Sequence, residues 1–184
     1  MRSLFFKAAL AIAIALLFLC SSAKAQVQDN DGCSNATLKG DYAVTVSGQF
    51  YLPSGVTVLR EGVAMAHYDG MGNFTQVDLV LSSPNAPPPP GVSPTDPISG
   101  FHNEEKGTYK VNADCTGTFT INFPELTNPS TGAMTPGAVI VAGFVLSDHG
   151  RAIHAIVTSL TPPGAPGPVP ALIHSESYKL DRKP

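Results

Sequence analysis

Eight segments with the residue alternation of β-strands, separated by stretches rich in glycine and proline, constrain the fold of this chain most strongly. In the segment 37–51, Tyr42, Val44 and Val46 share one parity, whereas Thr45 and Ser47 share the other. Such alternation is typical of a strand with one buried face. The other segments with strand character are 60–68, 74–82, 106–113, 118–123, 138–147, 151–160 and 171–180.

The connections between these segments are of two kinds. The short connections 69–73, 114–117 and 148–150 contain glycine and are typical of tight turns, in which Asp69 and Asp114 would bond their own backbone. The segment 83–100 contains seven of the chain's 17 prolines, and 161–170 contains five. Proline cannot donate to a β-ladder, so we predict loops there and over 124–137.

These segments predict an all-β domain, because no window after residue 25 shows sustained helical periodicity with caps. Eight strands joined mostly by short turns favour a single eight-stranded antiparallel up-and-down barrel, in which closure removes the exposed sheet edges. A two-sheet β-sandwich is the alternative, since the long connections could serve as crossovers. An eight-stranded barrel holds its own side chains or one small ligand.

Residues 1–25 have the pattern of a secretory signal peptide. Arg2 and Lys7 precede an apolar run, and Ala23 and Ala25 provide the small residues that precede a cleavage site. The run is shorter than the ~20 apolar residues that span a bilayer. We therefore predict a signal peptide over 1–25, a flexible segment over 26–36 and a barrel domain over 37–184, in a secreted or periplasmic protein that has no membrane attachment after signal cleavage.

Charge argues against one class of partner. The chain has 11 basic and 14 acidic residues, and three of the basic residues but none of the acidic ones precede residue 26. The remainder carries eight basic and 14 acidic residues, a net charge of −6. Nucleic acids require clustered Lys and Arg, so we expect no nucleic-acid partner.

Two cysteines remain after the predicted signal peptide, Cys33 and Cys115. An even number of cysteines in an oxidising compartment favours a disulfide, and two buried thiols are the alternative. A disulfide that closes the loop between Cys33 and Cys115 would stabilise the folded state by about 4–5 kcal/mol, because it reduces the chain entropy of the unfolded state.

The candidate site residues are few. His174, Glu176 and Tyr178 share one parity of the last segment, and His154 could approach them from the neighbouring segment. If that face lines the barrel, these side chains form a polar spot that orients a ligand; the alternative is a polar outer face. Glu104 and Glu105, beside Lys106, indicate a solvated charge cluster. No spacing predicts a metal site, a cofactor or catalytic residues, and we expect none.

Four stretches also resemble a group of uncharacterised secreted bacterial proteins. They are CSNATLKGDY at 33–42, YDGMGN at 68–73, GTYKVNADCTGT at 107–118 and the pattern Phe144-x-Leu146-x-Asp148. The resemblance implies a small barrel similar to calycins or to the allene oxide cyclase and dirigent barrel, and it supplies no catalytic residue. The proline-rich segment 83–100 departs from the short loop of that group.

Three functions are compatible with these features. The first is a secreted barrel that binds a small, largely apolar ligand. The alternatives are an isomerase of the allene oxide cyclase or dirigent type, and a structural or interaction protein with a filled barrel.

The segment 138–146 is apolar on both faces, with Val139, Val141 and Val145 on one of them. We therefore expect both faces to be buried, the outer one in a homo-oligomer.

Overall fold

The computed structural model describes residues 32–83, 101–127 and 131–181. The predicted signal peptide at 1–25 and nearly all of the proline-rich segment 83–100 lie outside these ranges. The helices within them are single 3-10 turns, and none is long and apolar enough to cross a bilayer.

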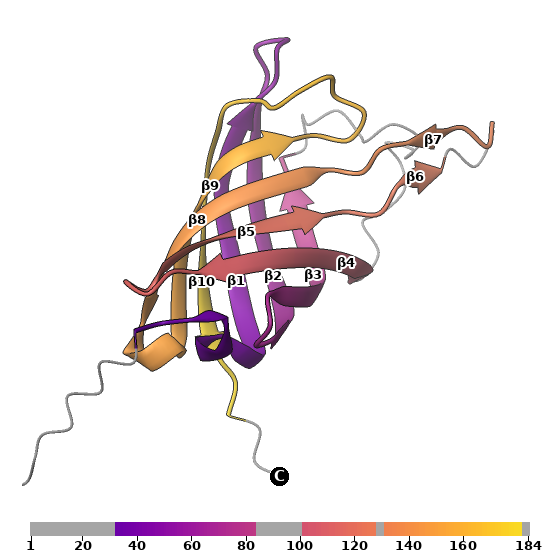
Figure 1. The fold of residues 1–184 in the computed structure, drawn as a ribbon. Helices are drawn as coiled ribbons and strands as arrows, with labels where there is room; N and C mark the ends of the chain where they lie inside the picture. Colours follow the sequence, from indigo (N-terminus) through magenta and orange to yellow (C-terminus); the bar gives the residue numbers. More distant parts are fainter. Residues whose placement is uncertain (1–31, 84–100, 128–130, 182–184) are drawn as a thin grey trace, which may run out of the picture. The chain divides into compact units, whose positions relative to one another are not determined.

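Eight strands form one closed antiparallel barrel in the order β1-β10-β9-β8-β5-β4-β3-β2 (Figure 1). Each strand of the barrel has a partner along both edges, so the predicted barrel is confirmed and the sandwich is not formed. Consecutive barrel strands are neighbours throughout, as in an up-and-down barrel. The strands are β1 (Lys39–Tyr51), β2 (Thr57–Asp69), β3 (Asn73–Ser82), β4 (His102–Val111), β5 (Thr116–Asn122), β8 (Val139–Ser147), β9 (Ala152–Thr161) and β10 (Ala171–Lys179).

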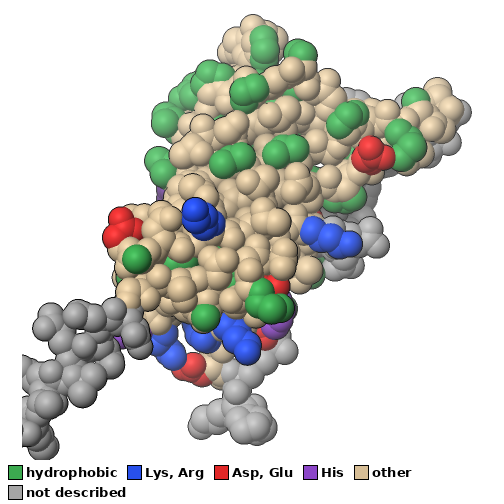
Figure 2. Space-filling model, viewed as in Figure 1, with side chains coloured by type: hydrophobic (Ala, Val, Ile, Leu, Met, Phe, Trp, Pro, Cys, Tyr) green, Lys and Arg blue, Asp and Glu red, His purple; other side chains and the backbone are tan. Residues whose placement is uncertain are grey.

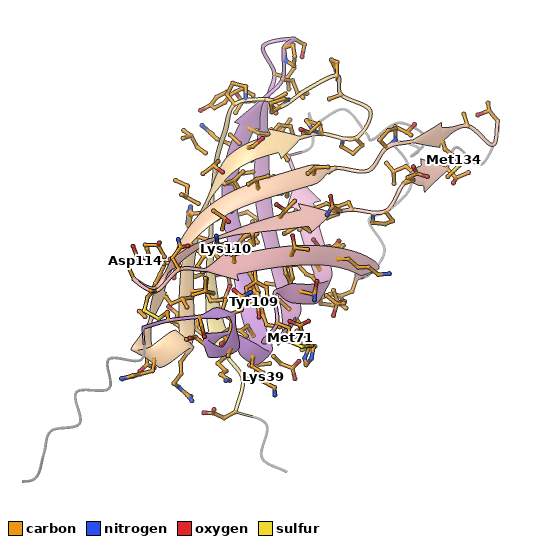
Figure 3. All side chains as sticks on the ribbon, in the orientation of Figure 1. Lys39, Met71, Tyr109, Lys110, Asp114 and Met134 are labelled. Carbon is orange, nitrogen blue, oxygen red and sulfur yellow. A yellow bond between two sulfur atoms is a disulfide. The ribbon has the colours of Figure 1, made fainter. Side chains whose placement is uncertain are left out.

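A small ribbon interrupts the predicted loop at 124–137. Strands β6 (Leu126–Thr127) and β7 (Met134–Thr135) pair with each other and extend beyond β5 and β8 (Figure 1). Met134 on this ribbon lies away from the barrel and is largely exposed (Figure 3). The proline-rich connection 162–170 matches its prediction as a loop, apart from a single bridge between Leu160 and Val169.

The two ends of the barrel differ in their connections. The end at which β2 meets β3, β4 meets β5 and β8 meets β9 has only tight turns, together with a 3-10 helix, η2 (Asn35–Thr37), and we call it the closed end. The opposite end, where β1, β3, β5 and β9 finish, carries the long connections, and we call it the loop end (Figure 1).

Asp69 and Asp114 stabilise turns at the closed end, as the sequence predicted. Asp69 Oδ1 accepts hydrogen bonds from the backbone N–H groups of Met71, Gly72 and Asn73 at 2.6–3.0 Å. A hydrogen bond from the Asn73 side chain, together with these backbone bonds, lowers the pKa of Asp69 to about 2. In the other turn, Asp114 Oδ1 accepts from the Thr116 hydroxyl at 2.7 Å.

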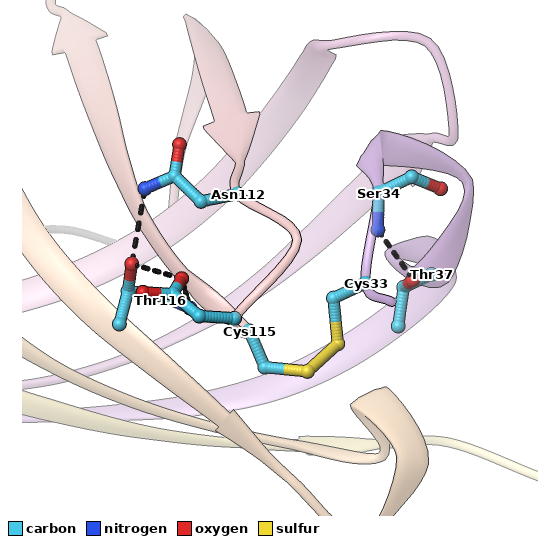
Figure 4. The surroundings of a disulfide bond; sticks show 7 residues. Cys33, Ser34, Thr37, Asn112, Cys115 and Thr116 are labelled. Atoms are coloured by element: carbon cyan, nitrogen blue, oxygen red, sulfur yellow. Dashed lines mark hydrogen bonds between the residues drawn. A yellow bond between two sulfur atoms is a disulfide. The ribbon is translucent and has the colours of Figure 1, made fainter. Parts of the chain in front are cut away.

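The predicted disulfide between Cys33 and Cys115 is present, with the two Cα atoms 4.9 Å apart (Figure 4). It joins the chain just before η2 to the turn between β4 and β5. Asn35 adds a second connection, because its side-chain oxygen accepts from the Val111 N–H at 2.8 Å. Residues 33–37, part of which fell in the segment predicted to be flexible, are therefore held against the barrel.

An aromatic cluster fills the closed-end half of the interior. The ring of Tyr68 lies 5.1–5.2 Å from the rings of Tyr42, Phe74 and Tyr109. Rings at such distances stabilise a core beyond their buried area. Hydroxyl groups at the edge are satisfied: Tyr109 donates to the Leu38 carbonyl oxygen at 2.8 Å. Figure 3 shows Tyr109 and its neighbour Lys110 on β4.

Glycines make room for these rings. A Cβ atom at Gly107 would lie 2.2 Å from the Phe74 ring, and one at Gly117 would lie 2.2 Å from the Phe144 ring. Both glycines lie on strands whose neighbouring interior positions are occupied by larger side chains. Glycine within a strand usually weakens it, but here the two rings need the space that a side chain would fill.

Strand β8 is apolar on both faces, but only one face is buried. Ala142 and Phe144 point inward and are buried, whereas Val145 on the outer face is 49% exposed. The outer face is the one that the expected homo-oligomer through 138–146 would cover. On the face seen in Figure 2, hydrophobic side chains are scattered and do not join into one continuous patch.

Candidate functional site

The four residues that the sequence singled out lie on the outside of the barrel. On β10, His174, Glu176 and Tyr178 alternate with the buried residues Ile173 and Ser177, and Tyr178 is 58% exposed. His154 on β9 is directly opposite Glu176, and its Nδ1 contacts Glu176 Oε2. The group therefore does not line the interior, and the observed arrangement is the alternative, a polar outer face.

A different polar group lies inside the barrel. Gln76 and Asp78 on β3 and Glu105 on β4 are buried, and Glu105 is only 1% exposed. Gln76 and Glu105 are directly opposite each other across the two strands, and Gln76 Nε2 donates to Glu105 Oε2 at 2.9 Å. We call Arg60, Gln76, Asp78 and Glu105 the interior polar group.

Glu105 retains its proton in this position. Burial, the charge of Asp78 and a hydrogen bond with Asp78 together raise its pKa to about 8, against the hydrogen bond from Gln76, which lowers it. Two carboxyl groups that share a low-dielectric site cannot both ionise easily. At neutral pH Glu105 therefore keeps its proton.

Arg60 on β2 brings a positive charge to this pair. Burial lowers the pKa of its guanidinium, and the negative charge of Asp78 raises it. The guanidinium carbon lies 5.4 Å from the centre of the Phe50 ring, a distance at which a cation is attracted to the ring face. The Arg60 guanidinium thus has the Asp78 carboxyl group near it, and such pairing is how buried charges are tolerated.

Apolar side chains adjoin the interior polar group at the loop end. Phe50 belongs to a second buried cluster that also contains Val58, Leu160, Val169 and Ile173. A cavity of about 420 Å³ lies at the edge of this cluster, between residues 52–53 and the loop 162–169. Val169 lines the cavity and belongs to the same cluster as Phe50, over whose ring the Arg60 guanidinium lies.

The prediction of a solvated cluster at Glu104 and Glu105 is wrong for Glu105. Strand β4 begins at His102, not at residue 106, and its parity places Glu105 inside with Gly107 and Tyr109. Extending the alternation of Tyr109 and Val111 backwards by two more steps would have indicated this. A run of charged residues hid the signal, because charge normally indicates solvent.

Strand β3 carries the second part of the group that sequence reasoning missed. Its apolar residues Val77, Leu79 and Leu81 share one parity, yet Leu81 is 51% exposed and the polar residues Gln76 and Asp78 are inside. Alternation identifies the strand without identifying the inward face. The buried polar face was therefore visible only once the neighbouring strands fixed the orientation.

The described ranges contain no group of three or more His, Cys, Asp or Glu side chains that could hold a metal ion. The interior polar group offers two kinds of hydrogen-bond donor, the Gln76 amide and the Arg60 guanidinium, while the Glu105 proton bonds Asp78. Such donors, beside an apolar surface, suit a ligand with a polar acceptor group and an apolar body. No protein-family model, no curated protein and no solved structure matches this chain.

Proposed function

We propose that this protein is a secreted or periplasmic β-barrel that binds a small, largely apolar molecule at the loop end. The observation that carries the proposal is the interior polar group, which places two carboxyl groups and a guanidinium in a β-barrel interior. Apolar residues of similar volume would usually serve stability as well or better. A group that stability does not require is best explained by a ligand that it binds.

The chemistry of the group specifies the ligand. The Arg60 guanidinium donates, so the ligand's polar group should be an acceptor: a carboxylate, a carbonyl or a hydroxyl. Its apolar body would contact Phe50 and the side chains around the cavity at 162–169. The aromatic cluster occupies the closed-end half, so the ligand enters and remains at the loop end.

Secretion is part of the proposal. The N-terminal pattern over 1–25 supports it, and so does the disulfide, since such bonds persist in oxidising compartments. The resemblance to secreted bacterial barrels points in the same direction. The expected homo-oligomer through 138–146 also remains a proposal, and Val145 now identifies the outer face on which it would form.

Three probes with the same apolar chain test the binding site. Decanoate, 1-decanol and decylamine differ only in their polar group, and calorimetric titration measures their affinities. We expect decanoate and decanol to bind, and the cationic decylamine to bind about tenfold or more weakly, because it cannot accept from Arg60.

The matched variants are Arg60→Gln and Arg151→Gln. Arg151 is at the closed end, where it pairs with Asp181 on the surface. Arg60→Gln should lower decanoate affinity about tenfold or more, whereas Arg151→Gln should leave it unchanged. If none of the probes binds, or if Arg60→Gln binds decanoate as tightly as the wild type, the proposal is wrong.

The interior acid also supports the second candidate, an isomerase of the allene oxide cyclase or dirigent type. Such a reaction needs a reactive apolar substrate held beside a proton donor, and Glu105 retains a proton at neutral pH. We then expect the wild type to convert a reactive epoxide to its isomer, and we expect the variant Glu105→Gln to bind the epoxide without converting it.

A further inference from the structure

Three side chains on the outer face of the barrel come together from three adjacent strands. Ser147 is the last residue of β8, His154 lies on β9 and Glu176 lies on β10. Glu176 is directly opposite His154 across β9 and β10. The β8–β9 pairing places Val145 opposite His154, so Ser147 is two residues further along the same face.

The contacts link the three side chains in series. Ser147 Oγ lies 2.8 Å from His154 Nε2, and His154 Nδ1 contacts Glu176 Oε2. The carboxylate is positioned to hold the Nδ1 proton, which leaves the Nε2 lone pair directed at the serine hydroxyl. This is the arrangement by which a histidine, oriented by a carboxylate, activates a serine nucleophile.

The group is partly shielded but still accessible. The side chains of His154 and Glu176 are 41% and 38% exposed. Exposed apolar residues surround them on the same face: Val145, Ile156 and Tyr178 are each about half exposed. The hydrophobic residues provide a surface for an acyl chain next to the serine.

The backbone immediately after Ser147 is unusual. Asp148 and His149 both have positive φ values, 49° and 55°, in the left-handed region that non-glycine residues rarely adopt. They precede Gly150, whose φ is also positive, in the turn between β8 and β9. Strained backbone of this kind is concentrated at functional sites.

We propose that Ser147, His154 and Glu176 form a second site, distinct from the interior polar group, that hydrolyses esters with an apolar acyl chain. Ser147 Oγ attacks the ester carbonyl carbon, and its proton moves to His154 Nε2. The bond to the alcohol oxygen breaks, and the alcohol leaves with that proton. Glu176 accepts from His154 Nδ1 and stabilises the imidazolium.

A water molecule completes the reaction. It attacks the acyl–Ser147 carbonyl while one of its protons moves to His154 Nε2. The bond to Ser147 Oγ breaks, and the proton returns to that oxygen as the carboxylic acid leaves. The balance is one ester and one water converted to one acid and one alcohol, so no oxidant, reductant or further co-reactant is required.

The chain contains two matched controls, each with half of the arrangement. Ser47 Oγ donates to Glu61 Oε1 at 2.8 Å, which is a serine–carboxylate pair on the barrel's outer surface. His67 Nδ1 lies 2.7 Å from Asp41 Oδ1, which is a histidine–carboxylate pair. Substitutions at Ser47 and His67 report what such surface pairs do without the complete series.

The experiment uses the whole folded protein and two probes. Diisopropyl fluorophosphate traps an activated serine, and peptide mass mapping locates the adduct; 4-nitrophenyl butyrate reports turnover. We expect the adduct on Ser147, and a fall of about 100-fold or more in hydrolysis for Ser147→Ala and His154→Gln. Ser47→Ala and His67→Gln should match the wild type.

Trapping on the wild type requires no variant and therefore does not depend on whether a variant folds. An adduct confined to Ser147, together with hydrolysis that Ser147→Ala abolishes, supports the proposal. Absence of an adduct on Ser147, or hydrolysis that Ser147→Ala leaves unchanged, overturns it. The interior proposal can fail independently, because the decanoate titration depends on Arg60 and not on these residues.

Discussion

The two halves of the barrel interior are packed with different kinds of side chains, although the same strands build both. The closed-end half contains tyrosine and phenylalanine rings, and the hydroxyl groups of Tyr42 and Tyr109 donate to backbone carbonyls, that of Tyr42 to Gly150 at 2.5 Å. The loop-end half contains Arg60, Asp78 and Glu105 beside a smaller apolar cluster. The comparison indicates that the closed end stabilises the barrel, whereas the proposed ligand would bind at the loop end.

The largest expected effect tests the closed end. Phe144→Ala should reduce the free energy of unfolding by about 3–5 kcal/mol, because it removes a buried ring and leaves a cavity. Urea unfolding of the oxidised protein measures this. Its neighbour Val145 is half exposed on the outer face, so Val145→Ala should change the free energy by less than about 1 kcal/mol. Equal losses would show that the aromatic cluster is not the stabilising region.

The next effect tests the loop end through pH. The pKa of Glu105 is about 8 in the folded chain and 4.5 ordinarily. The folded state therefore holds a proton that the unfolded state has released between pH 4.5 and 8, and stability falls as the pH rises through this window. The loss should be on the order of a few kcal/mol.

Urea midpoints at pH 5 and pH 8 measure this loss for the wild type and for Glu105→Gln. The variant has no proton to release at this position, so its stability should change less over the same range. A wild type that gains stability from pH 5 to pH 8 would mean that Glu105 is ionised in the folded state.

A smaller effect of opposite sign would sharpen the comparison. The triple variant Arg60→Leu, Asp78→Leu and Glu105→Leu should be as stable as the wild type or more stable by about 1–4 kcal/mol, because it replaces buried charges by apolar side chains. The same variant should lose decanoate binding. A severe loss of stability would instead assign the interior polar group a structural role.

The smallest effect returns to the closed end. Asp69→Asn should lower the melting temperature only slightly, because the amide still accepts from the backbone N–H groups of the turn. The pKa of Asp69 is about 2, so its ionised form supports the turn above the ordinary carboxyl pKa, and this support is lost as the pH falls toward 2. Thermal melting at pH 7 and pH 3 should show a larger pH difference for the wild type than for the variant.

Much of the fold could be predicted because hydrophobic alternation and turn residues are local signals. Each of the eight barrel strands overlaps a segment that alternation identified, although β4 begins at His102 and not at residue 106, and Asp69 and Asp114 bond their turns as expected. The disulfide was predictable from the even number of cysteines. The ribbon β6–β7 was not, because each of its strands has two residues, too few for alternation to show.

The candidate sites were harder to predict because they depend on which face of a strand points inward and on register. The sequence placed His174, Glu176 and Tyr178 on one face correctly but could not show that this face is the outer one. The contact between His154 and Glu176 follows from their pairing across β9 and β10, and Ser147 joins them only through the register of β8. Such registers are set by the closed sheet and not by local residue patterns.

The chain enters and leaves the barrel on neighbouring strands at the same end. Tyr42 on β1 pairs with Lys179 on β10, and the N–H of Leu180 donates to the Asp41 carbonyl oxygen at 2.8 Å. A tether joined to the chain before β1 or after β10 would thus attach at the closed end and point the loop end toward the solution. The same proximity suits circular permutation, in which a short linker joins these two strands and the new termini open in the turn between β1 and β2.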